Sequence, residues 1–465
     1  MNHSFTLSHL LGVLQATVLH PIAQDDGKRV RQVSTDSRGL AAGDVFVALR
    51  GDRFDGHAFV EAAWERGAIA AIVDRQFVPS ATLLGQTELL LLQVPDTLVA
   101  YQQLGQAWRQ QFAGPLVAIT GSVGKTTTKE LIAAVLATAV ETGPDGVLKT
   151  EANYNNEIGV PKTLLQLHPG HRFAVVEMGM RGLGEIELLS RLATPDVAVI
   201  TNVGTAHIER LGSEEAIAQA KCELLLHLKP EGTAVLNADN ERLMQRAAQV
   251  WSGKTLTFGL DRGDVCGQLR DAQTLQVGEY QFQLPLPGRH NALNFLAALA
   301  VAQVLGIDGS GLGQLQLTLP SGRSQRYALP QDVVILDETY NAGLESMLAA
   351  LELLADTPGQ RRIAVLGTMK ELGDRSLEFH QQVGERVAKL QLDALLTLAE
   401  PAEAAILAQG AAHVHTRAFG DGASLSQYLT TWVKPGDRLL FKASRAVALD
   451  RVVDQFRQDW PSERP

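Results

Sequence analysis

Apolar strand-like runs alternate with helix-like stretches from about residue 98 onward. Each predicted strand is followed by a predicted helix: PLVAIT by GKTTTKELIAAVLATA, FAVVEMG by GEIELLSRLA, and DVAVITNVG by SEEAIAQAKCELLLHL. The helical stretches repeat their apolar positions at helical spacing, whereas the strands are short and continuously apolar. This alternation predicts a mostly parallel sheet covered by helices.

Two further units flank this region. The first mixes short strands such as DVFVAL with turn signals and ends near QVPDTLVAYQQLG. A strand pair around TLQVGEYQFQLPL precedes the helix NALNFLAALAVAQVLG, and after the turn-rich TLPSGRSQR the alternation restarts with VVILDE, RIAVLG, ALLTLA and DRLLFKAS. We therefore predict an α/β protein of three domains: residues 1–97 (small α/β), 98–320 (mostly parallel sheet) and 321–465 (doubly wound, Rossmann-like).

Composition narrows the function classes. The 465 residues are 45% hydrophobic, and 41 basic against 51 acidic side chains give a formal charge of −10. An acidic chain argues against general binding to nucleic acid or a membrane surface, but a basic pocket for small anions remains compatible with it. Two cysteines, Cys222 and Cys266, make no disulfide framework, so we expect a reducing cytoplasm. We expect no signal peptide or membrane span.

The strongest local signal is AITGSVGKTTTKE, which lies between a predicted strand and a predicted helix. Backbone N–H groups of such a loop converge on phosphate oxygens, so Lys125 can neutralise the β/γ charge and the Thr126 hydroxyl can ligate Mg²⁺. Ile119 stands where the general pattern has a glycine, so a chance Gly-Lys-Thr is the alternative. The flanking strand and helix favour a nucleotide-phosphate site made by Gly121, Ser122, Val123, Gly124, Lys125, Thr126 and Thr127.

Three polar residues lie further along the same region. Glu177 ends one predicted strand and His207 follows another, so both reach the edge of the sheet where open α/β proteins bind ligands. Glu177 is a candidate Mg²⁺ ligand, with an ordinary water-facing glutamate as an equal alternative. A lone histidine is more often a surface or core residue, and Lys221 within a helix is by default a solvated charge. The local pattern leaves both open.

Nine motifs occur in an order that is characteristic of one family: GSVGKTTTKE, TEANYNNEIGVPKTLL, VVEMGMRG, NVGTAHIERLGS, AKCELL, GRHNALN, DETYNAGLESM, GTMKELG and FKASR. The chain resembles the Mur ligases from about residue 33 to residue 456. Its motifs are most similar to those of members that add D-alanyl-D-alanine to UDP-N-acetylmuramoyl-tripeptide.

The resemblance implies a UDP-sugar-binding domain, a central ATPase domain and a closing C-terminal domain. It further implies an ATP- and Mg²⁺-dependent ligase that works through an acyl phosphate in cytoplasmic peptidoglycan precursor synthesis. Its partners would be the UDP-linked tripeptide and D-alanyl-D-alanine, with neither nucleic acid nor membrane, and we expect a monomer.

The resemblance also assigns roles to the candidate residues. Lys125 and Thr126 serve the ATP phosphates and a first Mg²⁺, and Glu177 and His207 help to hold the metals. Lys221 matches a lysine that the family carries as a carbamate, an oxygen-bearing anion suited to Mg²⁺, so the catalytic set is Lys125, His207 and Lys221. The implied nucleotide contacts are Asn291, Asn294, Arg323, Asp337, Tyr340 and Asn341. Helical surface asparagines, a linker charge and strand-end residues are the alternatives for these positions.

A last group of residues matches the positions that contact the other substrates. Polar turns, an exposed loop arginine and helix-start solvation are the alternatives for this group. The basic and hydroxyl side chains suit a charged nucleotide and a dipeptide carboxylate. The UDP-sugar and peptide group consists of Ser34, Thr35, Asp36, Ser37, Arg38, Asn153, Asn155, Asn156 and Arg181, and the dipeptide group of Lys442, Ser444 and Arg445.

The chain departs from the family pattern in its third domain. Ala443 replaces a glycine, Thr368 an aspartate, and Gly343-Leu344 an Asn-Pro, while the phosphate and metal positions stay intact. One rival, a Mur ligase that adds the third residue, carries Asp-Asn-Pro-Arg where this chain reads YNAGLE. A folylpolyglutamate synthetase-like ligase is a second rival. A P-loop ATPase switch is a third, and it leaves the STDSR segment and the final domain without a purpose.

Overall fold

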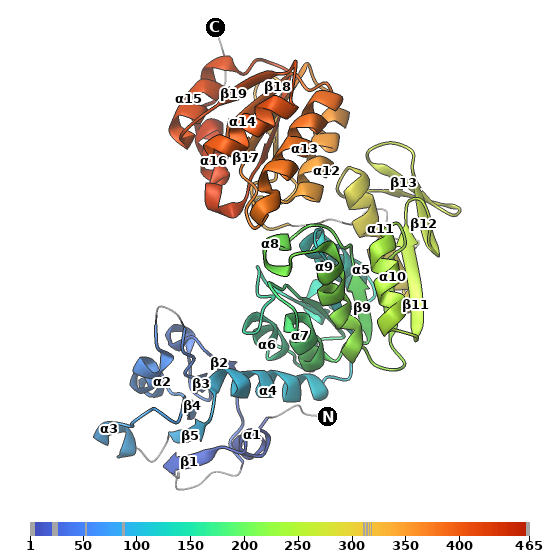
Figure 1. Cartoon of the computed structure of the whole chain (residues 1–465). Coiled ribbons are helices and arrows are strands. Elements are labelled where there is room, and N and C mark those ends of the chain that lie inside the picture. The colour runs from blue at the N-terminus through green and yellow to red at the C-terminus, as the bar shows by residue number, and fades with distance from the viewer. Residues whose placement is uncertain are drawn as a thin grey trace.

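The computed structural model describes residues 5–20, 27–51, 54–85, 89–309, 312, 315, 317 and 319–461. Three α/β units, each built on its own sheet, follow one another in space (Figure 1). This confirms the predicted fold class, while the boundaries at residues 97 and 320 remain predictions. Within the described ranges, no helix is long and apolar enough to cross a lipid bilayer.

The first unit contains a five-stranded sheet of order β1-β5-β4-β3-β2, in which only β1 is antiparallel to its neighbour. Its strands are β1 (Thr17–His20), β2 (Val33–Ser34), β3 (Val45–Val47), β4 (Ala70–Asp74) and β5 (Leu90–Val94). Its helices are α1 (Leu7–Leu14), α2 (Val60–Glu65), α3 (Ala81–Leu84) and the 3₁₀ helices η1 (Ser37–Gly39) and η2 (Gly56–Phe59). The connecting helix α4 (Thr97–Gln110) begins at Asp96, whose carboxylate accepts hydrogen bonds from two backbone N–H groups of the first turn.

The central unit has a nine-stranded sheet of order β14-β13-β12-β11-β10-β9-β6-β8-β7, parallel from β7 to β12. Its strands are β6 (Leu116–Thr120), β7 (Val147–Lys149), β8 (Phe173–Glu177), β9 (Val197–Ile200), β10 (Thr233–Asn237), β11 (Lys254–Gly259), β12 (Val265–Leu269), β13 (Thr274–Val277) and β14 (Tyr280–Gln283). The hairpin of β13 and β14 confirms the predicted strand pair.

Helices cover both faces of the central sheet, which explains why every residue of β6 and β9 is buried. Helices α5 and α11 pack together over one face. The central helices are α5 (Lys125–Ala137), η3 (Gly143–Gly146), α6 (Gly159–Leu164), α7 (Glu185–Ala193), α8 (Ile208–Leu211), α9 (Glu214–Cys222), η4 (Glu223–His227), α10 (Glu241–Val250) and α11 (Arg289–Val304).

The C-terminal unit has a six-stranded sheet of order β15-β16-β20-β17-β18-β19, parallel except for the edge strand β15. Its strands are β15 (Gln325–Leu329), β16 (Val333–Asp337), β17 (Arg361–Gly367), β18 (Ala394–Leu398), β19 (His415–Ala418) and β20 (Asp437–Lys442). Its helices are α12 (Leu344–Asp356), η6 (Gly373–Arg375), α13 (Ser376–Lys389), α14 (Pro401–Gly410), α15 (Gly422–Trp432), η7 (Arg445–Val447) and α16 (Leu449–Asp459).

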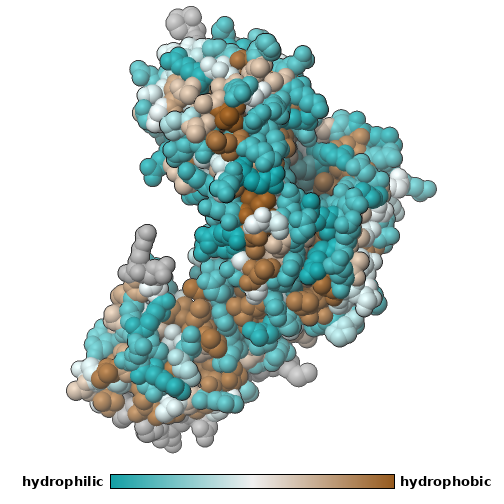
Figure 2. Space-filling model, in the orientation of Figure 1, coloured by the Kyte–Doolittle hydropathy of each residue, from teal (hydrophilic) through white to brown (hydrophobic). Residues whose placement is uncertain are grey.

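The carboxyl ends of the central strands face the C-terminal unit. One buried apolar cluster spans both units and includes Ile208 of the central unit and Leu372 of the C-terminal unit. In the space-filling view the outline is hollowed where the first and last units project beyond the central one (Figure 2). The crevice outside the carboxyl ends of parallel strands is where open α/β sheets bind their ligands.

Candidate active site

Two glycines allow the loop between β6 and α5 to turn sharply. Gly121 has φ +152°, and a Cβ there would clash with the Thr201 hydroxyl. Gly124, at the N-terminus of α5, has φ +82°, and its Cβ would lie 2.5 Å from Asn294 Oδ1. Any larger residue would meet both a steric clash and an unfavourable left-handed backbone. The sequence therefore folds this segment into the predicted phosphate loop.

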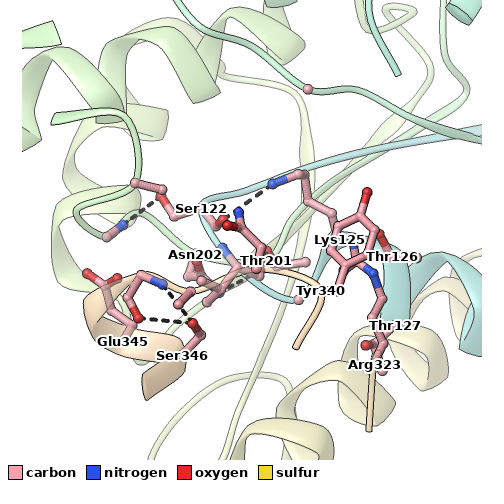
Figure 3. Close-up of a pocket in the computed structure, with 18 of the residues that line it drawn as sticks. Ser122, Lys125, Thr126, Thr127, Thr201, Asn202, Arg323, Tyr340, Glu345 and Ser346 are labelled. Carbon is pink, nitrogen blue, oxygen red and sulfur yellow. Dashed lines mark hydrogen bonds between the residues drawn. The ribbon is translucent and has the colours of Figure 1, made fainter. Parts of the chain in front are cut away.

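The loop is attached to the end of the neighbouring strand β9. The backbone N–H of Ser122 donates to Asn202 O at 3.1 Å, and that of Val123 to Asn202 Oδ1 at 3.0 Å. Ser122 Oγ in turn accepts from Gly204 N at 2.9 Å. These bonds fix the loop at the carboxyl edge of the sheet, and Figure 3 shows Ser122 beside Asn202.

Lys125 is the first residue of α5, and its side chain folds back onto the loop. Its Nζ donates to Gly121 O at 2.7 Å and to Ser122 O at 3.3 Å. Burial lowers its pKa, with the carboxylate of Glu177 opposing and the guanidinium of Arg323 adding to the decrease. Lys125, Glu177 and Arg323 come from three different parts of the chain and line the same cavity.

Thr126 and Glu177 meet as predicted from the shared strand edge. The Thr126 hydroxyl donates to Glu177 Oε2 at 2.9 Å, and Asn155 Nδ2 donates to Glu177 Oε1 at 2.8 Å. Both Thr126 and Glu177 are buried. Hydroxyl and carboxylate oxygens at this position have the chemistry that Mg²⁺ prefers beside nucleotide phosphates.

Lys221 lies on α9 with its side chain fully buried. Its Nζ has no hydrogen-bond partner among the residues that the structure describes. Burial, then the charge of Lys125, lowers its pKa well below the ordinary lysine value, although Glu223 and Glu185 oppose the shift. The alternative of a solvated helix charge is therefore wrong, because the side chain is fully buried.

His207 faces a carboxylate from the C-terminal unit. Its Nδ1 lies 2.6 Å from Glu371 Oε2, and this contact lowers the pKa of Glu371. Nearby, the Thr205 backbone N–H and hydroxyl donate to Glu345 at 2.6 and 3.2 Å. The sequence reasoning missed Glu345 and Glu371, although both lie in quoted motifs, because contacts between units leave no local pattern.

Basic side chains of the C-terminal unit gather around Tyr340. The Arg323 guanidinium carbon lies 3.7 Å from the ring centroid of Tyr340, and that of Arg445 lies 5.7 Å from it. Lys442 Nζ donates to Asn341 O at 2.9 Å, and its pKa is lowered by burial, with Glu338 opposing. Figure 3 places Arg323 and Tyr340 on the same side of the cavity as Lys125. An anion bound in this cavity would therefore be surrounded by basic side chains of both the central and the C-terminal unit.

Of three other residues predicted to contact the nucleotide, Asn291 and Asn294 line the cavity and Asp337 does not. Asn294 Oδ1 accepts from the Thr128 hydroxyl at 3.1 Å, Asn291 Nδ2 donates to Pro287 O at 2.9 Å, and both asparagines line the cavity. Asp337 instead turns its buried carboxylate to the N–H and hydroxyl of Thr339, away from the described lining. Its contact with nucleotide remains a prediction.

The STDSR segment belongs to the first unit and lies outside the cavity lining. Arg38 donates through Nε and a terminal nitrogen to Asp36 at 2.9 and 2.8 Å. These bonds lower the pKa of Asp36 to about 2, and the charge of Lys162 on α6 contributes. The positive charge of Lys162 on the central unit therefore acts on Asp36 in this segment.

One cavity of about 1410 Å³ lies between the central and C-terminal units. The structure brings most predicted site residues to it and leaves Gly121, Lys221, Asp337 and the STDSR segment outside its lining. The predicted residues that line it are Ser122, Val123, Gly124, Lys125, Thr126, Thr127, Asn153, Asn155, Asn156, Glu177, Arg181, His207, Asn291, Asn294, Arg323, Tyr340, Asn341, Lys442, Ser444 and Arg445.

A glycine-turned phosphate loop, an adjacent carboxylate and a facing basic surface define a nucleotide-dependent enzyme of the P-loop class. Three family models match in chain order: "Mur ligase family, catalytic domain" over residues 29–109, "Mur ligase middle domain" over 119–302 and "Mur ligase, glutamate ligase domain" over 322–445. The chain belongs to the Mur ligase family, and it is an ATP-dependent ligase.

Individual relatives agree over the whole length. The chain is 53% identical to UDP-N-acetylmuramoyl-tripeptide–D-alanyl-D-alanine ligase of Synechocystis, covering 99% of this chain and 100% of that one. Its fold matches MurF from Acinetobacter baumannii with a TM-score of 0.86 and 30% identity, covering 98% and 99% of the two chains. It also matches MurF from Thermotoga maritima in complex with ADP, with a TM-score of 0.80, 34% identity and coverage of 93% and 98%.

Proposed function

We propose that this protein joins D-alanyl-D-alanine to UDP-N-acetylmuramoyl-tripeptide at the expense of ATP, a step of peptidoglycan precursor synthesis in the cytoplasm. The observation that carries the proposal is the cavity in which the phosphate loop meets Arg323, Lys442 and Arg445 of the C-terminal unit. Such an enclosure suits a reaction that needs nucleotide, carboxylate and amine together. The full-length identity to ligases of this name supports the same substrates.

The residues present fit Mg²⁺. Thr126 and Glu177 supply hard oxygens, and the buried, unpartnered amine of Lys221 suits the predicted carbamate. His207 is the remaining candidate ligand. Among the described residues, no group of three or more His, Cys, Asp or Glu side chains is placed to hold a metal ion. When bound, Mg²⁺ supplies charge neutralisation for the phosphates.

The first step transfers the γ-phosphoryl group of ATP to the terminal carboxylate of the tripeptide, giving an acyl phosphate and ADP. Both reactants are anionic, so they repel each other until cations offset the charge. Lys125 on the loop and Arg323 on the C-terminal unit face the same space and stabilise charge on the transferring group. The Asn153–Asn156 turn, held on Glu177 through Asn155, orients the acceptor peptide.

In the second step the amine of D-alanyl-D-alanine attacks the acyl carbon and phosphate leaves. Lys442 and Arg445, near the end of β20, hold the dipeptide carboxylate, because cations at a fixed distance from the reacting carbon set the position of the amine. Closure of the C-terminal unit over the cavity would exclude water, which would otherwise hydrolyse the acyl phosphate.

Product analysis tests the proposal. Purified protein is incubated with ATP, Mg²⁺, UDP-muramoyl-tripeptide and D-alanyl-D-alanine, and the pentapeptide and phosphate are quantified by mass spectrometry and a phosphate assay. We expect both products in equal amounts, and neither when one substrate is omitted. A matched reaction with UDP-muramoyl-dipeptide and a free amino acid tests the third-residue ligase. Phosphate release that needs no amine acceptor would contradict the proposal and favour an ATPase switch.

A further inference from the structure

A buried lysine lies one helical turn after the phosphate loop, outside the residues assigned so far. Lys129, on α5, has a side chain only 1% exposed. Its Nζ lies 3.0 Å from Glu130 Oε1 and donates to Thr150 O at 2.7 Å. Glu130 also pairs with Lys149, whose side chain is 44% exposed. A buried ammonium is costly, so its partners indicate what it holds in place.

Thr150 connects Lys129 to the candidate magnesium carboxylate. It follows β7 and is fully buried. Its Oγ1 accepts from Glu177 N at 2.9 Å, while its carbonyl accepts from Lys129. Thr150 thus binds the Lys129 ammonium through its backbone carbonyl and the end of β8 through its side-chain hydroxyl.

The segment that begins at Thr150 returns to Glu177 at its other end. Asn155 Nδ2 donates to Glu177 Oε1 at 2.8 Å, and Asn155 O accepts from Gly179 N at 2.8 Å. The segment therefore bridges Lys129 and Glu177. It also carries Asn153, Asn155 and Asn156, which line the cavity.

We propose that Lys129 is a positioning residue that, through Thr150, sets both Glu177 for the magnesium-bound nucleotide and the 150–156 segment for the UDP-linked substrate. This inference rests on the proposed function. Lys129 does not line the cavity, so it acts through these neighbours rather than on a reactant. The competing account is a purely structural ion pair, which would stabilise the fold without affecting either ligand.

The test measures ADP binding to the full chain by titration calorimetry across a series of MgCl₂ concentrations. Lys129→Met should need about tenfold more Mg²⁺ for half-maximal ADP binding, as expected for loss of a residue that orients a metal ligand. Affinity for ADP without Mg²⁺ should stay within about twofold, because the phosphate loop is untouched. Lys149→Met removes the exposed cation from the same Glu130 and should match the wild type.

Steady-state kinetics adds a second readout. Lys129→Met should raise the KM for UDP-muramoyl-tripeptide several-fold and leave the KM for D-alanyl-D-alanine unchanged, since the dipeptide is held by the C-terminal unit. A structural ion pair has no reason to separate the two KM values.

A pair of Thr150 variants decides the matter if Lys129→Met does not fold. Thr150→Val removes the acceptor of Glu177 N and should reproduce the Mg²⁺ shift, whereas Thr150→Ser keeps the hydroxyl and should restore wild-type behaviour. Equal Mg²⁺ dependence in Thr150→Val, Lys129→Met and the wild type would overturn the inference alone. If the ADP affinity of the wild type did not depend on the Mg²⁺ concentration, the proposed magnesium site would be overturned, and the inference with it.

Discussion

At the residue scale, the phosphate loop was the most predictable part of the site. Glycine, lysine and threonine between a strand and a helix have few other uses, and the meeting of Thr126 with Glu177 follows from parallel strands ending at one edge. The buried state of Lys221 was not predicted, because lysine is by default a solvated charge, although it lies one helical turn after the buried Ile217 on α9. Glu345 and Glu371 escaped prediction for a related reason: their partners lie in another unit.

Removing the loop lysine tests the catalytic role. Lys125→Met should lower kcat/KM by about 10²–10³-fold or more, because the charge on the transferring phosphoryl group loses a fixed cation. Circular dichroism and the thermal midpoint should stay close to wild type, since the Lys125 bonds go only to its own loop. Near-normal turnover would contradict the assigned phosphate role.

The loop glycine can be tested against a matched glycine. Gly124→Ala should cost about 1–3 kcal/mol locally through its left-handed backbone and the clash with Asn294, and should abolish measurable ADP binding. Gly12→Ala, in the exposed part of α1 with nothing within 4 Å of the new Cβ, is the control and should bind ADP normally. Isothermal titration with MgADP distinguishes them, and equal affinity would show that the loop tolerates a side chain.

At the element scale, the strand–helix alternation predicted the central and C-terminal sheets well, since buried parallel strands are continuously apolar. The spatial order of strands could not be read, because β20 pairs with β16 and β17 through contacts distant in sequence. The turn after β17 is a further case. His380 on α13 accepts from Met369 N at 3.0 Å and its Nδ1 lies 2.7 Å from Ser376 O, which holds the GTMKELG turn.

These bonds need a neutral imidazole, so His380 should make stability pH-dependent. Burial lowers the pKa of His380 in the folded protein below its ordinary value near 6.5. The unfolded chain then takes up a proton that the folded chain does not, so the stabilisation is full above pH 6.5 and falls as the pH drops below it. Chemical denaturation at pH 7.5 and 5.5 should show this loss in the wild type. His380→Gln keeps an acceptor without titrating, and an identical pH slope in that variant would refute the assignment.

At the scale of the whole molecule, the central and C-terminal units are joined by one apolar cluster and by carboxylate contacts. The three-unit organisation was predictable from the strand–helix alternation, the turn-rich boundary segments and the motif order. The relative placement of the units was not, because it depends on a few side chains that meet across the cavity.

Glu345 should matter for this placement. Glu345→Ala leaves the partly buried Thr205 N–H without its acceptor, which costs about 1–3 kcal/mol, and the C-terminal unit should move away from the loop. Small-angle X-ray scattering should give a larger radius of gyration, and the KM for D-alanyl-D-alanine should rise. Glu400→Ala, which removes an exposed partner of Lys370, is the control. Unchanged scattering and KM in Glu345→Ala would count against a role in closure.

The last strand in the chain, β20 (Asp437–Lys442), lies in the middle of its sheet between β16 and β17. During synthesis, β16 and β17 cannot complete their pairing until β20 has left the ribosome. The C-terminal unit therefore completes its folding only near the end of translation. A chain cut short before that point would have β16 and β17 each with one unpaired edge, because β20 pairs with both of them.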